Sequence, residues 1–149
     1  MKIGYNTNGL AHHHCDDAIR LLAELGYQSV ALTIDHGLLN PTNGDVGNRC
    51  ETVKSLLDEH QLSSVIETGA RFLLNPHFKH EPTLLSPAAG GRQQRQAFLC
   101  DAIDIAVHLK SDCMSCWSGI MHDAASLTEG WERLVSGLTP VLDHAAEQG

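Results

Sequence analysis

Polar side chains stand at four places where the sequence predicts that a strand ends and a loop begins. These places read Asn6-Thr7-Asn8, Asp35-His36, Glu67-Thr68 and Trp117-Ser118. Glu67 is the most informative of them, because it follows the apolar end of a strand at Ile66, where an acid is costly unless it has a partner. A carboxylate at such a position can bind a divalent metal, transfer a proton or accept a hydrogen bond from a sugar hydroxyl. We therefore predict that Glu67 is a catalytic residue.

Asp35-His36 follows a second apolar strand. Neighbouring side chains of a strand point to opposite faces, so one of these two must point to the same face of the sheet as Glu67, at the same end of the strands. We predict that Asp35 binds substrate and that His36 joins Glu67 in catalysis or as a metal ligand. The alternatives are structural: Asp35 caps a loop, and Glu67 pairs with Arg71 or Arg92 or accepts from a loop amide.

A long connection with three prolines runs from Gly69 to Gly91. Loops of more than about 15 residues without regular structure are uncommon and are often functional. We predict that Arg71 and His77 bind substrate from this loop, which would act as a lid that carries cations toward a phosphate or carboxylate. The alternative is an exposed polar loop.

Asn6 and Trp117 complete the predicted substrate contacts. The indole of Trp117 would form an apolar wall against a sugar face, although packing under a loop explains it almost as well. The run His12-His13-His14 lies in the first predicted loop, and its imidazoles suit Zn²⁺, Mn²⁺ or Fe²⁺. A solvated polar loop is the alternative for this run.

Two further patterns favour structural roles. Cys113 and Cys116 have CxxC spacing, but on a strand these positions face opposite sides and no second pair exists, so buried structural cysteines are expected. Arg92 and Arg95 lie one turn apart at the start of a predicted helix. A phosphate could bind there, but two solvated arginines are the more common outcome.

The elements that must position these residues alternate along the chain. We predict a first helix that Asp16 or Asp17 caps and that runs to Leu25, and further helices from Gly47 to His60 and from Arg92 to Leu109. The last helix begins at Ser126, where Ser126 and Glu129 match a capping box, and Pro140 should kink or split it. The predicted strands are Lys2–Asn6, Gln28–Ile34, Ser63–Thr68 and Asp112–Trp117. Strict alternation of this kind implies parallel pairing with right-handed crossovers. The fold class is therefore α/β, of the (β/α) barrel type, in which active sites lie at the carboxyl ends of the strands.

Composition limits the partners. The 149 residues suit one domain, and their net charge of −8 with only ten Lys and Arg disfavours nucleic acid and anionic membrane surfaces. No apolar run is long enough to cross a bilayer. Five cysteines, an odd number, and the lack of an apolar leader favour a reducing cytoplasm.

Several segments together resemble the xylose isomerase-like TIM barrels, the sugar phosphate isomerase/epimerase superfamily. They are MKIGYNTNGLAHH, DDAIRLLAELGYQSVALTID, VIETGARFLLNP with HEPTL, and SCWSG. The resemblance implies a metal-dependent isomerase or epimerase that moves a proton next to the carbonyl of a sugar or polyol. It also implies a divalent ion (Mn, Mg, Zn or Co) at the barrel mouth. The superfamily includes an abasic-site endonuclease branch, which the acidic charge disfavours.

The resemblance also predicts that part of a barrel is missing. Only four βα units are present, and the usual metal ligands of these isomerases come from the later strands. We therefore expect the N-terminal half of a barrel, which pairs as a homodimer or requires a C-terminal half. A non-catalytic half-barrel module that serves binding or assembly is the alternative.

Overall fold

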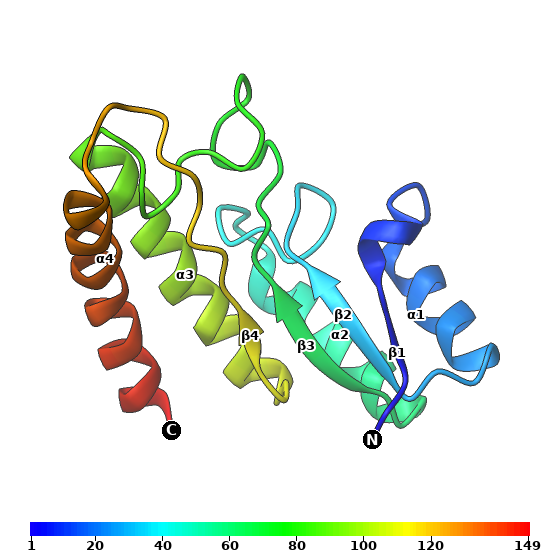
Figure 1. Cartoon of the computed structure of the whole chain (residues 1–149). Helices are drawn as coiled ribbons and strands as arrows, with labels where there is room; N and C mark the ends of the chain where they lie inside the picture. Colours follow the sequence, from blue (N-terminus) through cyan, green and yellow to red (C-terminus); the bar gives the residue numbers. More distant parts are fainter.

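The computed structural model describes residues 1–149 as a four-stranded sheet with four α-helices (Figure 1). Strands and helices alternate along the chain. Their order is β1 (Gly4–Asn6), η1 (Thr7–Leu10), α1 (Cys15–Glu24), β2 (Ser29–Thr33), α2 (Val46–Glu59), β3 (Ser63–Glu67), α3 (Ala89–Leu109), β4 (Met114–Ser115) and α4 (Leu127–Gln148). The predicted βα order is confirmed.

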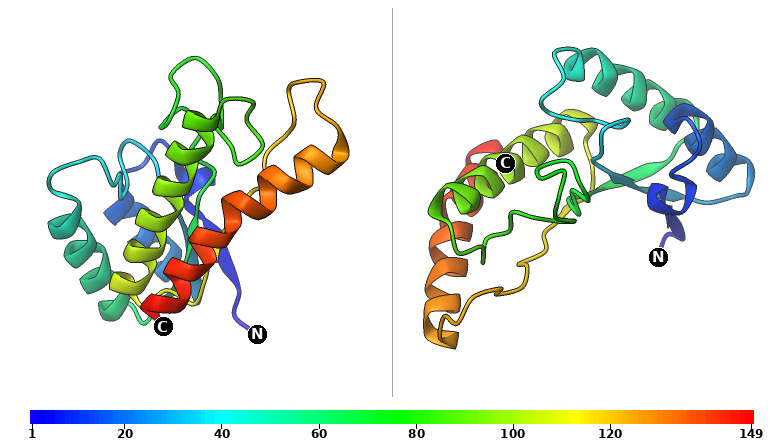
Figure 2. Two further views of the ribbon diagram at one scale, coloured as in Figure 1. Left: turned by 90° about the vertical axis from the view of Figure 1, so that its left-hand side faces the viewer. Right: turned by 90° about the horizontal axis from the view of Figure 1, so that it is seen from above.

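All neighbouring strands are parallel, in the order β1-β2-β3-β4. Every strand therefore ends at the same rim, which the connecting loops cover. The helices wrap around the outer face of the sheet, and the inner face is concave and open (Figure 2). This arrangement is half of a (β/α) barrel, as the sequence predicted.

Alternation along the strands separates a packed face from the concave face. Val30, Leu32 and Ile66 point toward the helices and are fully buried. The residues between them, Ala31 and Val65, line the concave face instead. By the same two-residue period, Glu67 points toward the concave face at the end of β3.

The start of α1 differs from the prediction. His14 occupies the N-cap without a side-chain hydrogen bond, and Asp16 and Asp17 lie in the first turn. The prediction that either aspartate caps the helix was therefore wrong. Asp16 instead pairs with Arg49 of α2, and this hydrogen-bonded guanidinium lowers the pKa of the Asp16 carboxyl. The sequence separation of the pair explains why local patterns did not indicate it.

Asp16→Asn is expected to lower the melting temperature at pH 7 and to have less effect in acid. A depressed folded-state pKa contributes stability that is present above the unfolded value of 3.8 and is lost as pH falls through the folded value. Thermal unfolding from pH 7 to pH 2 measures the effect. Asp143→Asn, at an exposed carboxylate of α4, is the control. A pH-independent loss of stability in Asp16→Asn would contradict the assigned cause.

The fourth strand is shorter than predicted, since only Met114 and Ser115 pair with β3. Cys113 and Cys116 are exposed free thiols rather than buried structural cysteines, so that prediction was wrong. The reason is the position of β4, which is the last strand of the sheet and has no neighbour on its outer side.

Helix α4 begins with the predicted capping box of Ser126 and Glu129, and it is continuous past Pro140. Pro140 has no N–H to donate to the carbonyl of Ser136, four residues earlier. Gln96 of α3 donates to that carbonyl over 3.4 Å instead. The expected split into two helices is therefore not seen. None of the helices combines the length and the apolar character that crossing a membrane requires.

Candidate functional site

Glu67 occupies the carboxyl end of β3 on the concave face, level with Thr33 of β2 and Ser115 of β4. The hydroxyl of Thr33 donates to Oδ1 of Asn6 over 2.9 Å, so Asn6 lies in the same polar row. Asn6 and Glu67, both predicted site residues, are thus presented to one face. Below this row the face is lined by small side chains.

Neither arginine that the sequence offered as a structural partner pairs with Glu67. Arg71 contacts Asn8 and Asp35, and Arg92 donates to the carbonyls of Ser86 and Pro87. No other hydrogen bond or ion pair holds the Glu67 side chain. The half-buried carboxylate therefore remains available to a ligand on the concave face.

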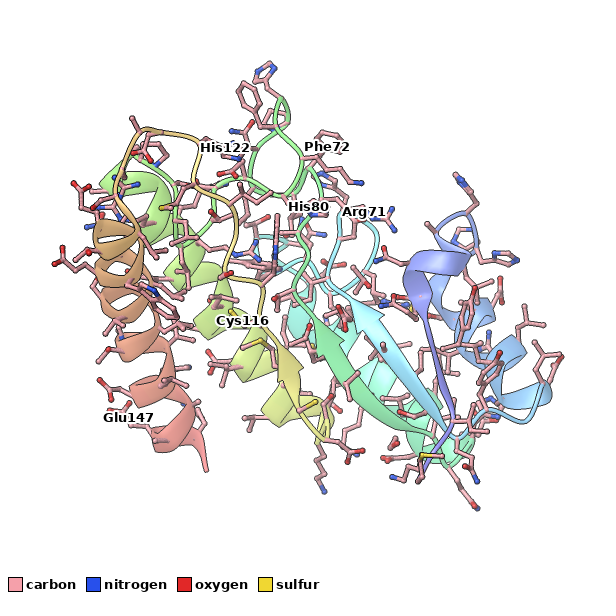
Figure 3. The ribbon with its side chains drawn as sticks, viewed as in Figure 1. Arg71, Phe72, His80, Cys116, His122 and Glu147 are labelled. Carbon is pink, nitrogen blue, oxygen red and sulfur yellow. The ribbon has the colours of Figure 1, made fainter.

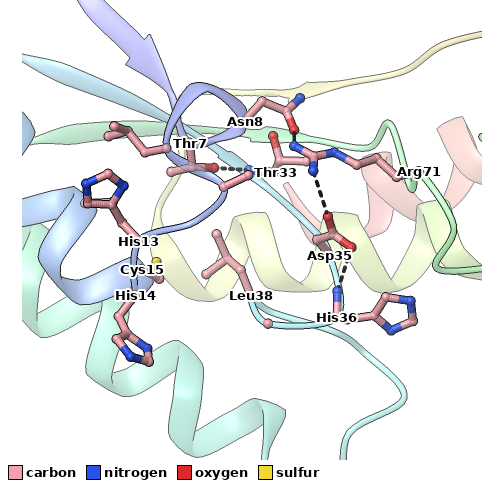
Figure 4. A pocket seen from close by; sticks show the side chains of 14 residues that line it. Thr7, Asn8, His13, His14, Cys15, Thr33, Asp35, His36, Leu38 and Arg71 are labelled. Atoms are coloured by element: carbon pink, nitrogen blue, oxygen red, sulfur yellow. Dashed lines mark hydrogen bonds and ion pairs between the residues drawn. The ribbon is translucent and has the colours of Figure 1, made fainter.

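Beside this face, a cavity of about 290 Å³ lies between the first and second βα loops (Figure 4). Arg71 reaches it from the third loop and approaches Asp35 with 3.7 Å between Nη1 and Oδ2. Asp35 also accepts a hydrogen bond from the backbone N–H of His36 over 2.8 Å. Asp35 and Arg71, both predicted to bind substrate, are thereby brought together, and the capping role foreseen for Asp35 is present as well.

Cys15 forms part of the cavity wall. Burial raises the pKa of its thiol to about 11. At neutral pH the side chain is therefore a neutral thiol, which is a poor nucleophile and a poor metal ligand. Arg71 contacts both Asn8 and Asp35 in the cavity, whose polar lining also includes His13, His14 and His36.

His36 lies at the rim of the cavity and is exposed. A tight turn explains this position, because Asp35 and Leu38 exchange both backbone hydrogen bonds across it. No contact joins His36 to Glu67, and their joint role in catalysis or metal binding stays a prediction.

The third loop places its histidines differently. His77 is exposed, whereas His80 donates its Nδ1–H to the carbonyl of Gly69 over 2.6 Å. The His80 ring also meets the indole of Trp117 edge-on at 5.3 Å (Figure 3 labels His80). Trp117 therefore packs under this loop, as the structural alternative proposed. Because 39% of its surface remains exposed, part of the indole is still accessible.

The third and fourth loops also join at Glu81 and His122, 3.1 Å apart, and at Gly119. Gly119 has φ +100°, and a Cβ there would lie 2.2 Å from Oγ1 of the buried Thr83. Such a contact cannot form without displacing one of the loops. The two loops thus cover the end of β3 as one packed unit.

Gly119→Ala is expected to lower the free energy of unfolding by about 3 kcal/mol, from left-handed backbone strain and overpacking together. Urea unfolding measures the loss. Gly37→Ala is the matched control, because a Cβ at Gly37 meets no atom within 4 Å. Equal stabilities of the two variants would show that the loops separate easily.

No three His, Cys, Asp or Glu side chains gather where they could hold a metal ion. His12, His13 and His14 are all exposed, and His13 and His14 also line the cavity beside Asp35 (Figure 4). The divalent ion that the sequence suggested, with Glu67 and His36 among its ligands, stays a prediction.

Sequence reasoning missed the role of Arg95, which was expected to be solvated and is fully buried. Its Nη2 donates to the carbonyl of Thr68 over 2.6 Å, directly after Glu67. Thr68 in turn donates its hydroxyl to the carbonyl of Ser115 over 2.6 Å. Arg95 and Thr68 thus contact the end of β3, next to the backbone that carries Glu67. The only indication of this role in the sequence was the position of Arg95 in a predicted helix, on the side that faces the sheet.

Residues 19–149 match the family described as xylose isomerase-like TIM barrel. The chain belongs to this family. No curated protein matches the chain. The family match agrees with the half barrel.

Solved structures share the fold at low sequence identity. The chain aligns over its whole length with a D-tagatose 3-epimerase-like protein (17% identity, TM-score 0.76) and with D-psicose 3-epimerase from Clostridium cellulolyticum H10, solved with D-tagatose (19%, 0.71). It aligns over 99% with a xylose isomerase domain protein from Planctomyces limnophilus (17%, 0.69). It covers 50%, 50% and 51% of these proteins, respectively, and so spans about half their length.

Proposed function

We propose that this chain supplies half of the active site of a sugar or polyol isomerase or epimerase, with Glu67 as its acid/base residue. The observation that carries the proposal is the unpaired Glu67 carboxylate at the mouth of the concave face. Support also comes from the family and from the structural neighbours, which are described as D-psicose 3-epimerase and a D-tagatose 3-epimerase-like protein.

The chemistry requires a proton to leave a carbon next to a carbonyl and return to the same or the neighbouring carbon. Glu67 would accept that proton, which leaves an enediolate, and would then give it back. Return by Glu67 to the neighbouring carbon, with a matching proton shift between the two oxygens, moves the carbonyl. Inversion of the carbon instead requires a second acid on the opposite face of the enediolate, which donates its proton there while Glu67 keeps the proton that it accepted. Asp35, Asn6 and the free face of Trp117 would bind hydroxyls and the apolar face of the sugar.

The proposal includes a divalent ion (Mn, Mg, Zn or Co) only as one that residues of this chain and residues from outside it would bind together. Glu67 would provide one ligand and His36 is the predicted second, while the remaining ligands must come from outside these residues, because no cluster of three forms within them. We assign no step of the proton transfer to the ion.

A non-catalytic assembly module is the second candidate, and the open inner face of the sheet favours it. Deuterium exchange separates the two. The purified chain is incubated in ²H₂O with D-tagatose or D-fructose and Mn²⁺, Mg²⁺, Zn²⁺ or Co²⁺, and the sugars are analysed by NMR. Deuterium next to the carbonyl, together with the epimer, is the expected result. Folded protein that neither exchanges nor binds any ketose at millimolar concentration would overturn the proposal.

A further inference from the structure

The cavity between the first and second βα loops is richer in basic groups than the chain as a whole. Its lining includes Arg71, His13, His14 and His36, and Asp35 is the only acid in it. The whole chain, by contrast, has 18 Asp and Glu against 10 Lys and Arg. The lining therefore reverses the charge balance of the molecule at this place.

Arg71 is the fixed cation of the cavity. Its Nη2 donates to Oδ1 of Asn8, and its Nη1 lies 3.7 Å from Oδ2 of Asp35, which is beyond hydrogen-bond distance. A guanidinium carries several further N–H donors in one plane, and no protein group accepts from them here. The side chain is thus held by two loops, remains 30% exposed and keeps most of its donors for a ligand.

The pairing with Asp35 leaves room for a stronger anionic partner. Oδ1 of this carboxylate already accepts from the backbone N–H of His36 over 2.8 Å. An ion pair at 3.7 Å between two partly exposed side chains contributes little. The rings of His13, His14 and His36 lie at the rim and have no hydrogen bond or ion pair (Figure 4), so they are free to turn toward an anion and take up a proton beside it.

The floor of the cavity is apolar. Ala18 and Leu38 are buried there, and Cys15 adds a neutral thiol. Above such a floor an ionic contact is screened less than on an open surface. The volume of about 290 Å³ is close to the lower limit of small-molecule sites, which suits one end of a small ligand.

The cavity adjoins the part of the sheet that carries Glu67. Thr33 is the register partner of Glu67 and also lines the cavity. Asp35 follows Thr33 by two residues, so it lies on the same face about 7 Å farther along the chain direction. This separation is comparable to the length of an extended hexose chain. A sugar that reacts at Glu67 would therefore place its far end beside Arg71.

We propose that this cavity binds an anionic group, a phosphate ester or a carboxylate, at the far end of the substrate, and that Arg71 selects substrates that carry one. The inference rests on the proposed function for the position of the reacting carbon, whereas binding of the anion requires no reaction. Neutral ketoses would still enter the mouth but would lack this contact. Of the two cations that the sequence offered in the third loop, Arg71 lines the cavity and His77 does not.

Calorimetric titration of the full chain with D-fructose, D-fructose 6-phosphate and D-fructuronate tests the proposal, because these ketoses differ only at the far carbon. At least one of the two anionic sugars is expected to bind about 10-fold more tightly than D-fructose, since bidentate contacts between a guanidinium and an anion are strong. The tighter of the two identifies the group. Arg71→Gln should remove this preference and leave the affinity for D-fructose within about twofold. Arg20→Gln, which removes the same charge from α1 outside the cavity, is the control.

NMR of the unmutated chain gives a second reading if Arg71→Gln loosens the loops. Inorganic phosphate should shift the ring signals of His13 and His14 but not those of His60 and His108, which lie outside the cavity. Equal affinities for all three sugars, with unmoved His13 and His14 signals, would overturn this inference and leave the proposed reaction standing. A preference for an anionic sugar that survives Arg71→Gln would overturn the role of Arg71. Anionic sugars that bind as expected but exchange no deuterium would support the site and remove the proposed reaction instead.

Discussion

Glu67→Gln is expected to reduce ketose turnover by at least about 100-fold, because it removes the proposed proton acceptor. Glutamine keeps the size of the side chain and its hydrogen-bonding oxygen. It has no partner to lose within the chain, since neither Arg71 nor Arg92 contacts Glu67. Melting temperature and oligomeric state should therefore stay unchanged.

The measurement is the steady-state rate with each ketose, with kcat and KM determined separately. A proton-transfer role lowers kcat and leaves KM within a few fold, whereas a role in binding alone raises KM. Glu59→Gln is the control, because Glu59 is an exposed carboxylate on α2. Turnover in Glu67→Gln that equals the control would remove Glu67 from the mechanism.

The fold was largely predictable from the sequence, because the local patterns of strands and helix starts agree with the βα order of the whole chain. Apolar runs such as 28–34 and 63–66 could only be buried strands, and the Ser126–Glu129 box determined the start of α4. Helices between such strands impose parallel order. The position of Glu67 follows from these patterns, since the two-residue period of β3 decides its face.

Features that depend on long-range contacts were not predictable. Asp16 was assigned to a cap, but its partner Arg49 lies on another helix. Cys113 and Cys116 were expected to be buried, yet they flank the short strand β4 at the open edge. The pairing of Arg71 with Asn8 and Asp35 joins three different loops and leaves Glu67 free. None of these relations has a characteristic spacing in the sequence.

Arg95 is the clearest such case, and its two replacements should behave very differently. Its Nη2 has one acceptor, the Thr68 carbonyl, while Nε and Nη1 are buried without partners. Burial lowers the pKa of Arg95, and the nearby Cys116 and Glu81 only partly offset this effect. The charge of Arg95 is thus costly to bury, whereas its side chain packs well. The guanidinium lies over Phe98, with 5.2 Å between Cζ and the ring centroid.

Arg95→Met is expected to change the free energy of unfolding by less than about 1 kcal/mol, because it fills the space, keeps the contact with Phe98 and removes the uncompensated charge. Arg95→Ala leaves a cavity under the third loop and should cost about 3 kcal/mol. Urea unfolding of both variants, with Arg20→Ala on the exposed face of α1 as control, measures the difference. A loss in Arg95→Met as large as in Arg95→Ala would instead mean that the hydrogen bond to Thr68, and not the packing, stabilises the end of β3 beneath Glu67.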